Sequence, residues 1–317
     1  MPEAGGLPIT ERVLRRLPGP RLLWMLFWGA VFFLHVAVLV ATRDIPARDP
    51  ELSFGLVALY MVPVALWGIA RITRELDRLR PTVTELAGED AAWPFRGLGH
   101  VPGPLALAAI PTALYARTGS NIVLVLPLSA LANFAVNLPI MTLVWAYGVV
   151  VLGLIRLGRS PLRLRPFAAD RSLGLRPVGG IAFAALWIVL LGAFPLLPLT
   201  LLDPRTAWLV LSTVTVLVVL FFLSLYQLHR RMVEAKAGHM ARARQTYAQA
   251  FAPAWTAGEC VESGQALALL AAEALERRAL AIQAWPFDEG IFARVAAIVT
   301  TVIAAILARF ILEQFGL

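Results

Sequence analysis

The sequence predicts an all-α integral membrane protein: a polytopic helical bundle of about seven spans, two of them less clear than the others, with a cytoplasmic helical hairpin. Hydrophobic residues make up 59% of the 317 residues and charged residues only 15%, whereas soluble domains carry about 45–50% and 25%. The apolar residues collect in stretches of about 20, the length that crosses a bilayer. The basic residues collect in the segments that connect these stretches.

Five spans are clear in the pattern of hydropathy. Residues 22–41 and 52–70 are two long apolar stretches joined by a short, mildly acidic connection. Residues 178–200 and 206–228 form a second pair around a short turn, and residues 291–312 form the last span. Each of these stretches is long enough to cross the hydrocarbon core as a helix.

The region between the second and the third clear span allows two interpretations. Proline removes a helix hydrogen bond, so we expect a break at Asn137-Leu138-Pro139. Either residues 98–116 and a kinked helix 121–155 both cross, or residues 122–155 form a tight hairpin while residues 104–116 lie on the surface. Both interpretations add two crossings, which gives seven in total.

The arginines predict the orientation, because basic residues are retained on the cytoplasmic side of a membrane. They are concentrated in residues 1–21, 71–103 and 156–177 and in the segment after residue 228, all on one side of the predicted membrane. The other side holds Arg43, Arg48, Arg117 and Arg205. We therefore expect a cytoplasmic N-terminus and an outer C-terminus.

The predicted organisation has four parts. They are a cytoplasmic N-terminal segment (1–21), a membrane bundle (22–228) with cytoplasmic loops at 71–103 and 156–177, a cytoplasmic helical hairpin (229–290), and a final span with a short outer tail (291–317). Basic residues are almost all arginine, and Ala, Leu and Gly are abundant. This usage is typical of a GC-rich bacterial gene, so we expect the plasma (inner) membrane of a bacterium.

Residues 229–290 are the longest segment outside the predicted spans. No proline occurs between Pro204 and Pro253, so the helix of span 206–228 can continue outward for a total of about 50 residues. A second helix is expected near residues 263–285. Its apolar residues recur at helical spacing: Leu267, Leu270, Ala271, Ala274, Ile282 and Trp285. The first helix offers a thinner stripe of its own: Met232, Ala235, His239, Ala243, Tyr247 and Ala250.

The tripeptide Trp-Pro-Phe occurs twice, at 93–95 and 285–287. Each copy follows a basic segment and precedes an apolar stretch. One interpretation is an internal duplication with parallel repeats. The other is an interfacial entry, in which Trp anchors at headgroup depth and Pro starts a helix.

Several kinds of chemistry lack their usual residues. No predicted span contains Asp or Glu, although ion-coupled carriers usually place a carboxylate at membrane depth. Zinc-protease, nucleophile-elbow and phosphate-loop motifs are absent. Cys260 is the only cysteine, which excludes an internal disulfide and a cysteine-based metal site. We therefore predict no catalytic residue, metal or cofactor, and the sequence points away from an enzyme; a lipid-modifying enzyme is the weakest of the classes considered.

Three intramembrane polar residues are candidates for function. Asn133 and Asn137 are four residues apart and share a helix face near the middle of the membrane. They could line a pore, or they could act as interhelical hydrogen-bonding groups. His35 is the only ionisable side chain well inside a span. It is either a proton site or haem ligand, or a neutral histidine bonded to a neighbouring helix; no second histidine lies at a matching depth for a bis-histidine haem.

The loop 166–177 is a candidate docking surface for the hairpin or for anionic lipid, through Asp170, Arg171 and Arg176. Asp170 is expected to cap a short helix that holds Arg171. The alternative is a basic retention loop with an interfacial helix. No nucleic acid is expected as a partner, because the basic residues flank the spans and the aromatic residues lie in the spans and at their ends.

Two functional classes follow from this reading. The first is a non-enzymatic sensor or scaffold that acts through its cytoplasmic hairpin, as a homo-oligomer or with a membrane or cytoplasmic protein partner, in contact with the lipid bilayer. The alternative is an oligomeric channel or facilitator for an uncharged or weakly selected solute, whose path is lined by the polar break at 133–139.

Overall fold

The computed structural model describes residues 6–43, 50–88, 92–118, 126–165, 170–196, 204–256 and 263–287 and most of 290–304. Within these residues every regular element is a helix, which agrees with the all-α prediction. The bounds are α1 Ile9–Arg16, α2 Arg21–Arg43, α3 Pro50–Ala87, α4 Pro102–Thr118, α5 Leu126–Arg159, α6 Arg176–Ala193, α8 Pro204–Thr256 and α9 Ser263–Leu280.

Five of the described helices are long and apolar enough to cross a membrane. The helical portions that contain a membrane-length apolar stretch are Arg21–Val38, Gly55–Ala87, Ser129–Arg159, Arg176–Ala193 and Val210–Gln249. Large apolar side chains cover the outer face of α2, where Leu22 is 64% and Leu34 60% exposed. Such a surface is unfavourable in water, so it supports a membrane location. Half of the predicted span 291–312 lies outside the described residues.

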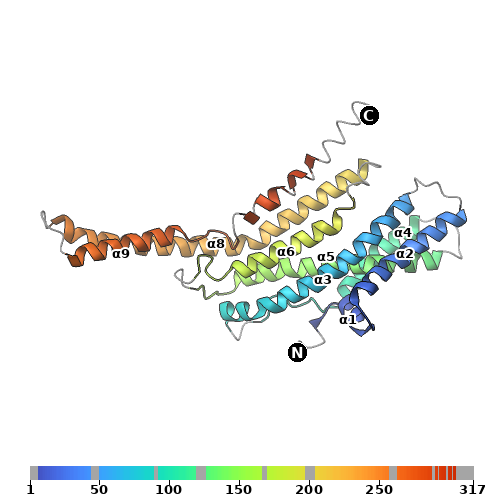
Figure 1. The fold of residues 1–317 in the computed structure, drawn as a ribbon, viewed down its shortest axis with the longest axis horizontal. Helices are drawn as coiled ribbons and strands as arrows, with labels where there is room; N and C mark the ends of the chain where they lie inside the picture. Colours follow the sequence, from blue (N-terminus) through green and yellow to red (C-terminus); the bar gives the residue numbers. More distant parts are fainter. Residues whose placement is uncertain are drawn as a thin grey trace, which may run out of the picture.

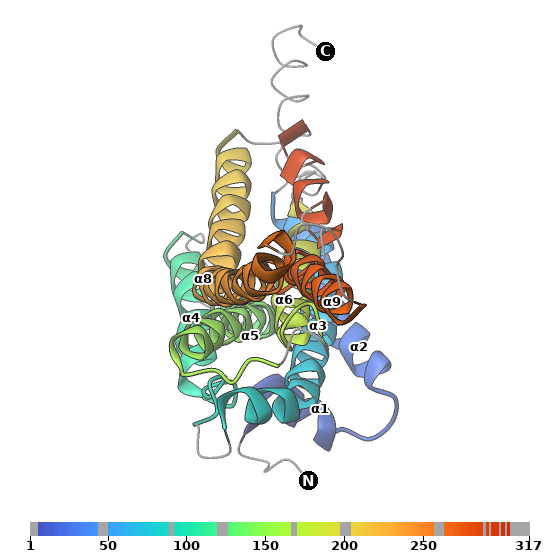
Figure 2. The ribbon, with the colours of Figure 1, turned by 90° about the vertical axis from the view of Figure 1, so that its left-hand side faces the viewer.

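The helices form an elongated bundle with a long projection at one end (Figure 1). One core lies among α3, α5, α6 and α8 and contains the large buried side chains of Ile69, Leu154, Leu186 and Phe221. A second, smaller core joins α1 and α2 to the outer sides of α3 and α5. Seen along the long axis, α8 and α9 lie on the opposite side of the bundle from α1 (Figure 2).

The predicted break at Asn137-Leu138-Pro139 is wrong. Helix α5 runs without interruption from Leu126 to Arg159, with Pro139 inside it. This excludes the interpretation in which residues 122–155 form a tight hairpin. Helix α4 packs along α5, and its apolar part, Pro102–Leu114, is shorter than the five membrane-length helices.

Helix α2 compensates for the prolines in its two neighbours. Pro139 has no N–H, so it leaves the carbonyl of Ala135 without its helical donor. The indole Nε1 of Trp28 donates to this oxygen at 2.8 Å. On α3, Pro63 frees the carbonyl of Leu59 in the same way. That oxygen points at Gly29, where an added Cβ would lie only 3.3 Å from it. A helix with a side chain at residue 29 could not approach so closely.

The first part of the predicted connection 71–103 is helical, because α3 continues to Ala87. The reason is a core-facing stripe that continues beyond the apolar stretch. Its members are spaced alternately four and three residues apart, the spacing of left-handed helix packing. They are Ile72, Leu76, Leu79, Val83 and Leu86, all buried.

Helix α1 was not predicted. Its eight residues pack beneath α2, α3 and α5, and Leu14 is only 2% exposed. Arg12 fixes it to the bundle by donating from Nη2 to the carbonyl of Gly99 at 2.6 Å. The described part of the N-terminal segment is therefore packed against the bundle.

Candidate functional site: the junction between bundle and arm

Helix α8 is one continuous helix of 53 residues, or about 80 Å at 1.5 Å per residue. Its first part belongs to the bundle, and its second part projects beyond it (Figure 1). The two views together show a change of direction between the two parts (Figure 2). We call residues 229–256 of α8 and residues 263–287 the arm. The residues that would connect α8 to α9, 257–262, lie outside the described part of the chain.

Helix α9 packs along the projecting part of α8 through small residues. Ala272 and Ala279 of α9 are buried, as are Met232 and Ala243 of α8. Alanine at the contact lets two helix backbones approach closely. Met232 and Ala243 belong to the stripe that the sequence pattern picked out on the first helix.

The expected apolar stripe of the second helix packs inward only at its end, where Ile282 is buried. Leu267 is 67% exposed and Leu270 62% exposed, although both belong to the predicted packing face. The close approach through Ala272 and Ala279 turns these larger leucines outward. The arm therefore presents large apolar side chains that no described residue covers.

Lys236 ties the end of α9 to α8. Its Nζ donates to the carbonyl of Leu280 at 2.9 Å and to the carbonyl of Ile282 at 2.7 Å. The last carbonyls of a helix lack intrahelical donors and carry partial negative charge. A positive side chain at this place stabilises the helix end. Lys236 is the only lysine in the chain.

An aromatic cluster lies where the arm meets the bundle. The ring of His229 stacks on Trp285 with centroids 4.1 Å apart, and its Nδ1 lies 2.8 Å from the carbonyl oxygen of Ala284. Phe287, two residues further on, stacks on Phe221 of α8 at 5.9 Å. The second Trp-Pro-Phe segment therefore packs against the middle of α8.

Helix α6 holds the same segment from the other side. A Cβ added at Gly179 would overlap the carbonyl oxygen of Pro286, so the backbones approach more closely than any larger residue allows. The preceding loop makes a further contact, in which the backbone N–H of Gln283 donates to the carbonyl of Arg171 at 3.1 Å. The junction thus joins α6, α8 and the end of the arm.

Asp170 organises that loop, but not as the cap of a short helix. Residues 171–174 form a turn. The Asp170 carboxylate accepts hydrogen bonds from the backbone N–H of Ser172 at 2.9 Å, from the Ser172 hydroxyl at 2.7 Å and from the backbone N–H of Gly174 at 2.9 Å. Leu173 and Gly174 both have positive φ, 55° and 88°, and cannot continue a right-handed helix. Partial burial of the carboxyl raises its pKa, but these hydrogen bonds outweigh burial and lower the pKa of Asp170 below its ordinary value.

The loop is also fixed to α3. Arg165 forms a bidentate ion pair with Glu85, in which its Nε lies 2.8 Å from Oε1. The backbone N–H of Arg163 donates to the carbonyl of Leu86 at 2.7 Å. The sequence pattern did not single out Arg165 or Glu85, because the 80 residues between them give no local signal.

The three predicted docking residues make different contacts. Asp170 shapes the turn, Arg171 contributes its carbonyl to the junction, and the backbone N–H of Arg176 donates to Ser172 Oγ at 3.2 Å at the start of α6. The loop contacts the segment after α9 through the carbonyl of Arg171, and a docking role for the three side chains stays a prediction. The contact uses backbone groups, whereas the hypothesis emphasised the charged side chains.

The intramembrane candidates lie away from this junction. Asn137 Nδ2 donates to Asn133 Oδ1 at 2.7 Å and to the carbonyl of Asn133 at 3.0 Å. Both side chains are buried, so each amide serves its neighbour on α5. His35 is half-buried on α2. The structure does not bring His35 and the two asparagines to the junction.

The first Trp-Pro-Phe segment packs much as the second does. Phe95 is buried against α5, where a Cβ at Gly153 would overlap its ring. Arg156 Nη1 donates to the carbonyl of Pro94 at 3.2 Å. In both copies, a glycine in a bundle helix leaves the space that the Trp-Pro-Phe segment occupies. This agrees with either earlier interpretation, duplication or interfacial entry.

Among the described residues, no group of three or more His, Cys, Asp or Glu side chains is placed to hold a metal ion. The chain matches no known family, and neither a curated protein nor a solved structure shows significant similarity to it.

Proposed function

We propose that this chain is a membrane-embedded sensor or scaffold that acts through the arm. The observation that carries the proposal is the continuity of α8, which belongs to the bundle at one end and to the arm at the other. The junction adds contacts from α6 and from the loop 170–175 to the base of the arm. Rearrangement of the bundle would therefore be transmitted to the arm.

The exposed leucines supply the reason to expect a binding partner. Leu267 and Leu270 lie on the outer side of α9, away from α8. Exposed apolar groups of this size mark interaction surfaces. The partner in this proposal is a protein surface, either a second copy of the chain or another protein of the same compartment.

The arginine distribution places the arm in the cytoplasm in this proposal. The arm follows Arg230 and Arg231 and carries Arg242 and Arg244. The N-terminal segment and the loop that contains Arg165 lie on the same side. The compartment follows from the sequence rule, and the long α8 is compatible with it.

The experiment compares the full-length chain with a variant that carries Leu267→Glu and Leu270→Glu. The chain is reconstituted in nanodiscs, self-association is measured by mass photometry, and partners are captured by affinity purification after cross-linking in cells. We expect the variant to lose the specific complex. The matched control carries Ala268→Glu and Ala281→Glu, which adds the same charges at exposed positions without removing a large apolar side chain.

The channel alternative predicts a flux of solute across the membrane, which the sensor or scaffold proposal does not. In liposomes loaded with small uncharged solutes, a sensor or scaffold gives no flux above that of empty vesicles. A flux that disappears in the Asn133→Leu, Asn137→Leu variant, with folding retained, would overturn the proposal. So would a complex that survives both leucine substitutions.

A further inference from the structure

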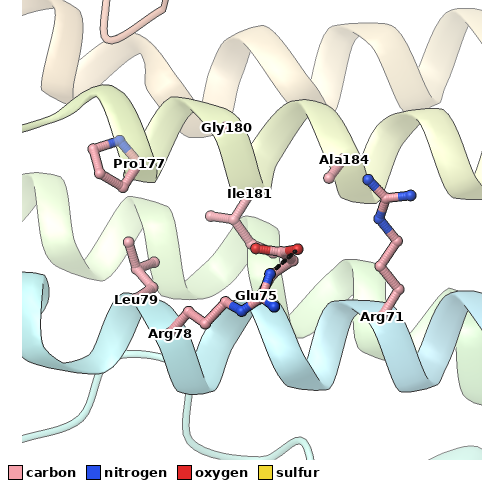
Figure 3. Close-up of a pocket in the computed structure, with 8 residues that line it drawn as sticks. All are labelled: Arg71, Glu75, Arg78, Leu79, Pro177, Gly180, Ile181 and Ala184. Carbon is pink, nitrogen blue, oxygen red and sulfur yellow. Dashed lines mark hydrogen bonds and ion pairs between the residues drawn. The ribbon is translucent and has the colours of Figure 1, made fainter.

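A groove between α3 and α6, outside the junction, is lined by the two arginines Arg71 and Arg78 (Figure 3). Helix α3 contributes Arg71, Glu75 and Arg78, spaced four and three residues apart and therefore on one face. Helix α6 contributes Pro177, Gly180, Ile181 and Ala184. The groove has a volume of about 300 Å³, at the lower end of the range of roughly 300–1,000 Å³ for small-molecule sites.

The groove exists because long side chains on one helix face small ones on the other. A Cβ added at Gly180 would meet nothing within 4 Å, and Ala184 adds only a methyl group. Figure 3 shows the guanidinium of Arg71 reaching from α3 toward Ala184. Larger residues on α6 would fill this space.

The charges in the groove are unequal. Arg78 forms an ion pair with Glu75 at 3.2 Å, so the charges of these two residues cancel. Arg71 has no carboxylate within ion-pair distance among the described residues; its guanidinium lies over the ring of Trp67, 5.4 Å from the centroid. The groove therefore retains one net positive charge, that of Arg71, with donors free to form a bidentate contact.

The position of the groove along α3 indicates the source of a ligand. Arg71 is the first charged residue after the apolar stretch 52–70, and Trp67 lies one turn before it. Tryptophan followed by arginine is the usual order at the headgroup level of a membrane. Basic pockets between helices at this level bind anionic lipid headgroups.

We propose that the groove between α3 and α6 binds the phosphodiester headgroup of an anionic phospholipid, with Arg71 as its main contact. The single negative charge of a phosphodiester matches the single unbalanced charge of the groove. The planar guanidinium of Arg71 suits two phosphate oxygens. The acyl chains extend from the headgroup along the apolar parts of α3 and α6. The groove shares Pro177 with the loop 166–177, but its charged lining comes from α3, and it is separate from the exposed leucines of the arm.

The test uses the full-length chain in detergent with equal amounts of phosphatidylglycerol and phosphatidylcholine that carry identical acyl chains. Native mass spectrometry counts the lipids retained. We expect the unmodified chain to retain phosphatidylglycerol about tenfold more strongly, in keeping with the worth of a hydrogen bond to a charged group. Arg71→Gln removes the charge, and Gly180→Leu fills the groove; each is expected to abolish most of this preference.

Two control variants separate the groove from general effects of charge and size. Arg74→Gln removes a charge from the same helix at a residue that does not line the groove. Gly148→Leu adds the same side chain at another helical glycine that has open space. Both controls are expected to keep the preference. Leucine favours helix more than glycine does, so Gly180→Leu is expected to fold, and equal thermal unfolding midpoints verify this.

Three results would overturn the proposal. The first is equal retention of phosphatidylglycerol by the Arg71→Gln and Arg74→Gln variants. The second is equal retention of the two lipids by the unmodified chain. The third is release of the bound lipid by millimolar inorganic phosphate, which would assign the groove to a soluble phosphate compound.

Discussion

At the scale of single residues, Trp28 and Gly29 explain how two prolines fit inside membrane-length helices. Each proline leaves one carbonyl without a donor, and an unpaired carbonyl is costly where water is excluded. Trp28 bonds one of these carbonyls directly. Gly29 lets the other carbonyl, that of Leu59, lie close to the α2 backbone.

Replacing Trp28 by Phe is expected to lower the free energy of unfolding by about 1–2 kcal/mol, because the Ala135 carbonyl loses its donor. Reversible unfolding in mixed micelles measures the change. Trp187→Phe is the control, since Trp187 lies at an exposed position of α6.

A double-mutant cycle makes this test specific. Pro139→Ala restores an N–H that can reach the Ala135 carbonyl, so Trp28→Phe should cost much less in that background. Equal costs in both backgrounds would show that the indole contributes packing and no hydrogen bond of consequence.

Asp170→Asn is expected to destabilise the chain by about 1 kcal/mol at neutral pH, because an amide cannot accept all the hydrogen bonds that the carboxylate accepts. The pKa of Asp170 in the folded chain lies below its ordinary value of 3.8. Its contribution is therefore complete above about pH 4 and is lost as the pH falls through the lower, folded-state pKa. Thermal unfolding at pH 7 and pH 3 checks both statements: the difference between the two proteins should shrink at the lower pH.

At the scale of elements, two adjacent glycines of α6 have different surroundings, and the junction depends on only one of them. Gly179 lies against the backbone of Pro286, whereas Gly180 faces open space. Backbone atoms cannot move aside as a flexible side chain can. The contact between α6 and the end of the arm is therefore sensitive to one methyl group at residue 179 and insensitive to one at residue 180.

Gly179→Ala is accordingly expected to displace residues 283–287 and to cost about 1–3 kcal/mol, the usual range for overpacking. Gly180→Ala should be neutral or slightly stabilising, because alanine favours helix. Hydrogen exchange of residues 280–287 is the measurement, and we expect faster exchange only in the first variant. Similar exchange in both variants would contradict the close approach seen at Pro286.

The sequence predicted elements better than it predicted their ends. The apolar stretches 22–41, 52–70, 178–200 and 206–228 predicted long helices, and α2, α3, α6 and α8 overlap them, because helix length and hydropathy are local properties. The failure at Pro139 has a different origin, since the donor that compensates for it belongs to Trp28, more than 100 residues away. Leu267 and Leu270 were assigned to the wrong face because a packing contact made by alanines produces little hydrophobic periodicity.

At the scale of the whole molecule, the chain combines an apolar bundle with a polar arm. The bundle shows exposed leucines and valines where lipid would surround it, and α8 carries no charged residue between Arg205 and Arg230, where its projecting part begins. This division is the reason to expect that the two parts lie in different solvents.

The predicted sidedness can be tested by cysteine labelling in a Cys260→Ser background. Arg74→Cys, Arg159→Cys and Arg244→Cys should all be protected from a membrane-impermeant maleimide in intact cells and should react after the membrane is opened. Asp203→Cys should react from outside. These expectations rest on the retention of basic segments in the cytoplasm. Labelling of residue 244 in intact cells would show that the arm lies outside the cell, opposite to the prediction.

The solitary lysine gives the protein a built-in chemical reporter. Apart from the amino terminus, the chain offers one primary amine, and that amine holds the last turn of α9. Acylation of Lys236 would remove the charge at that helix end and so weaken the contact with α9. Release of α9 would in turn expose the amine to the reagent. The rate at which an amine reagent labels intact protein therefore reports how often this fastening opens, without any engineered probe.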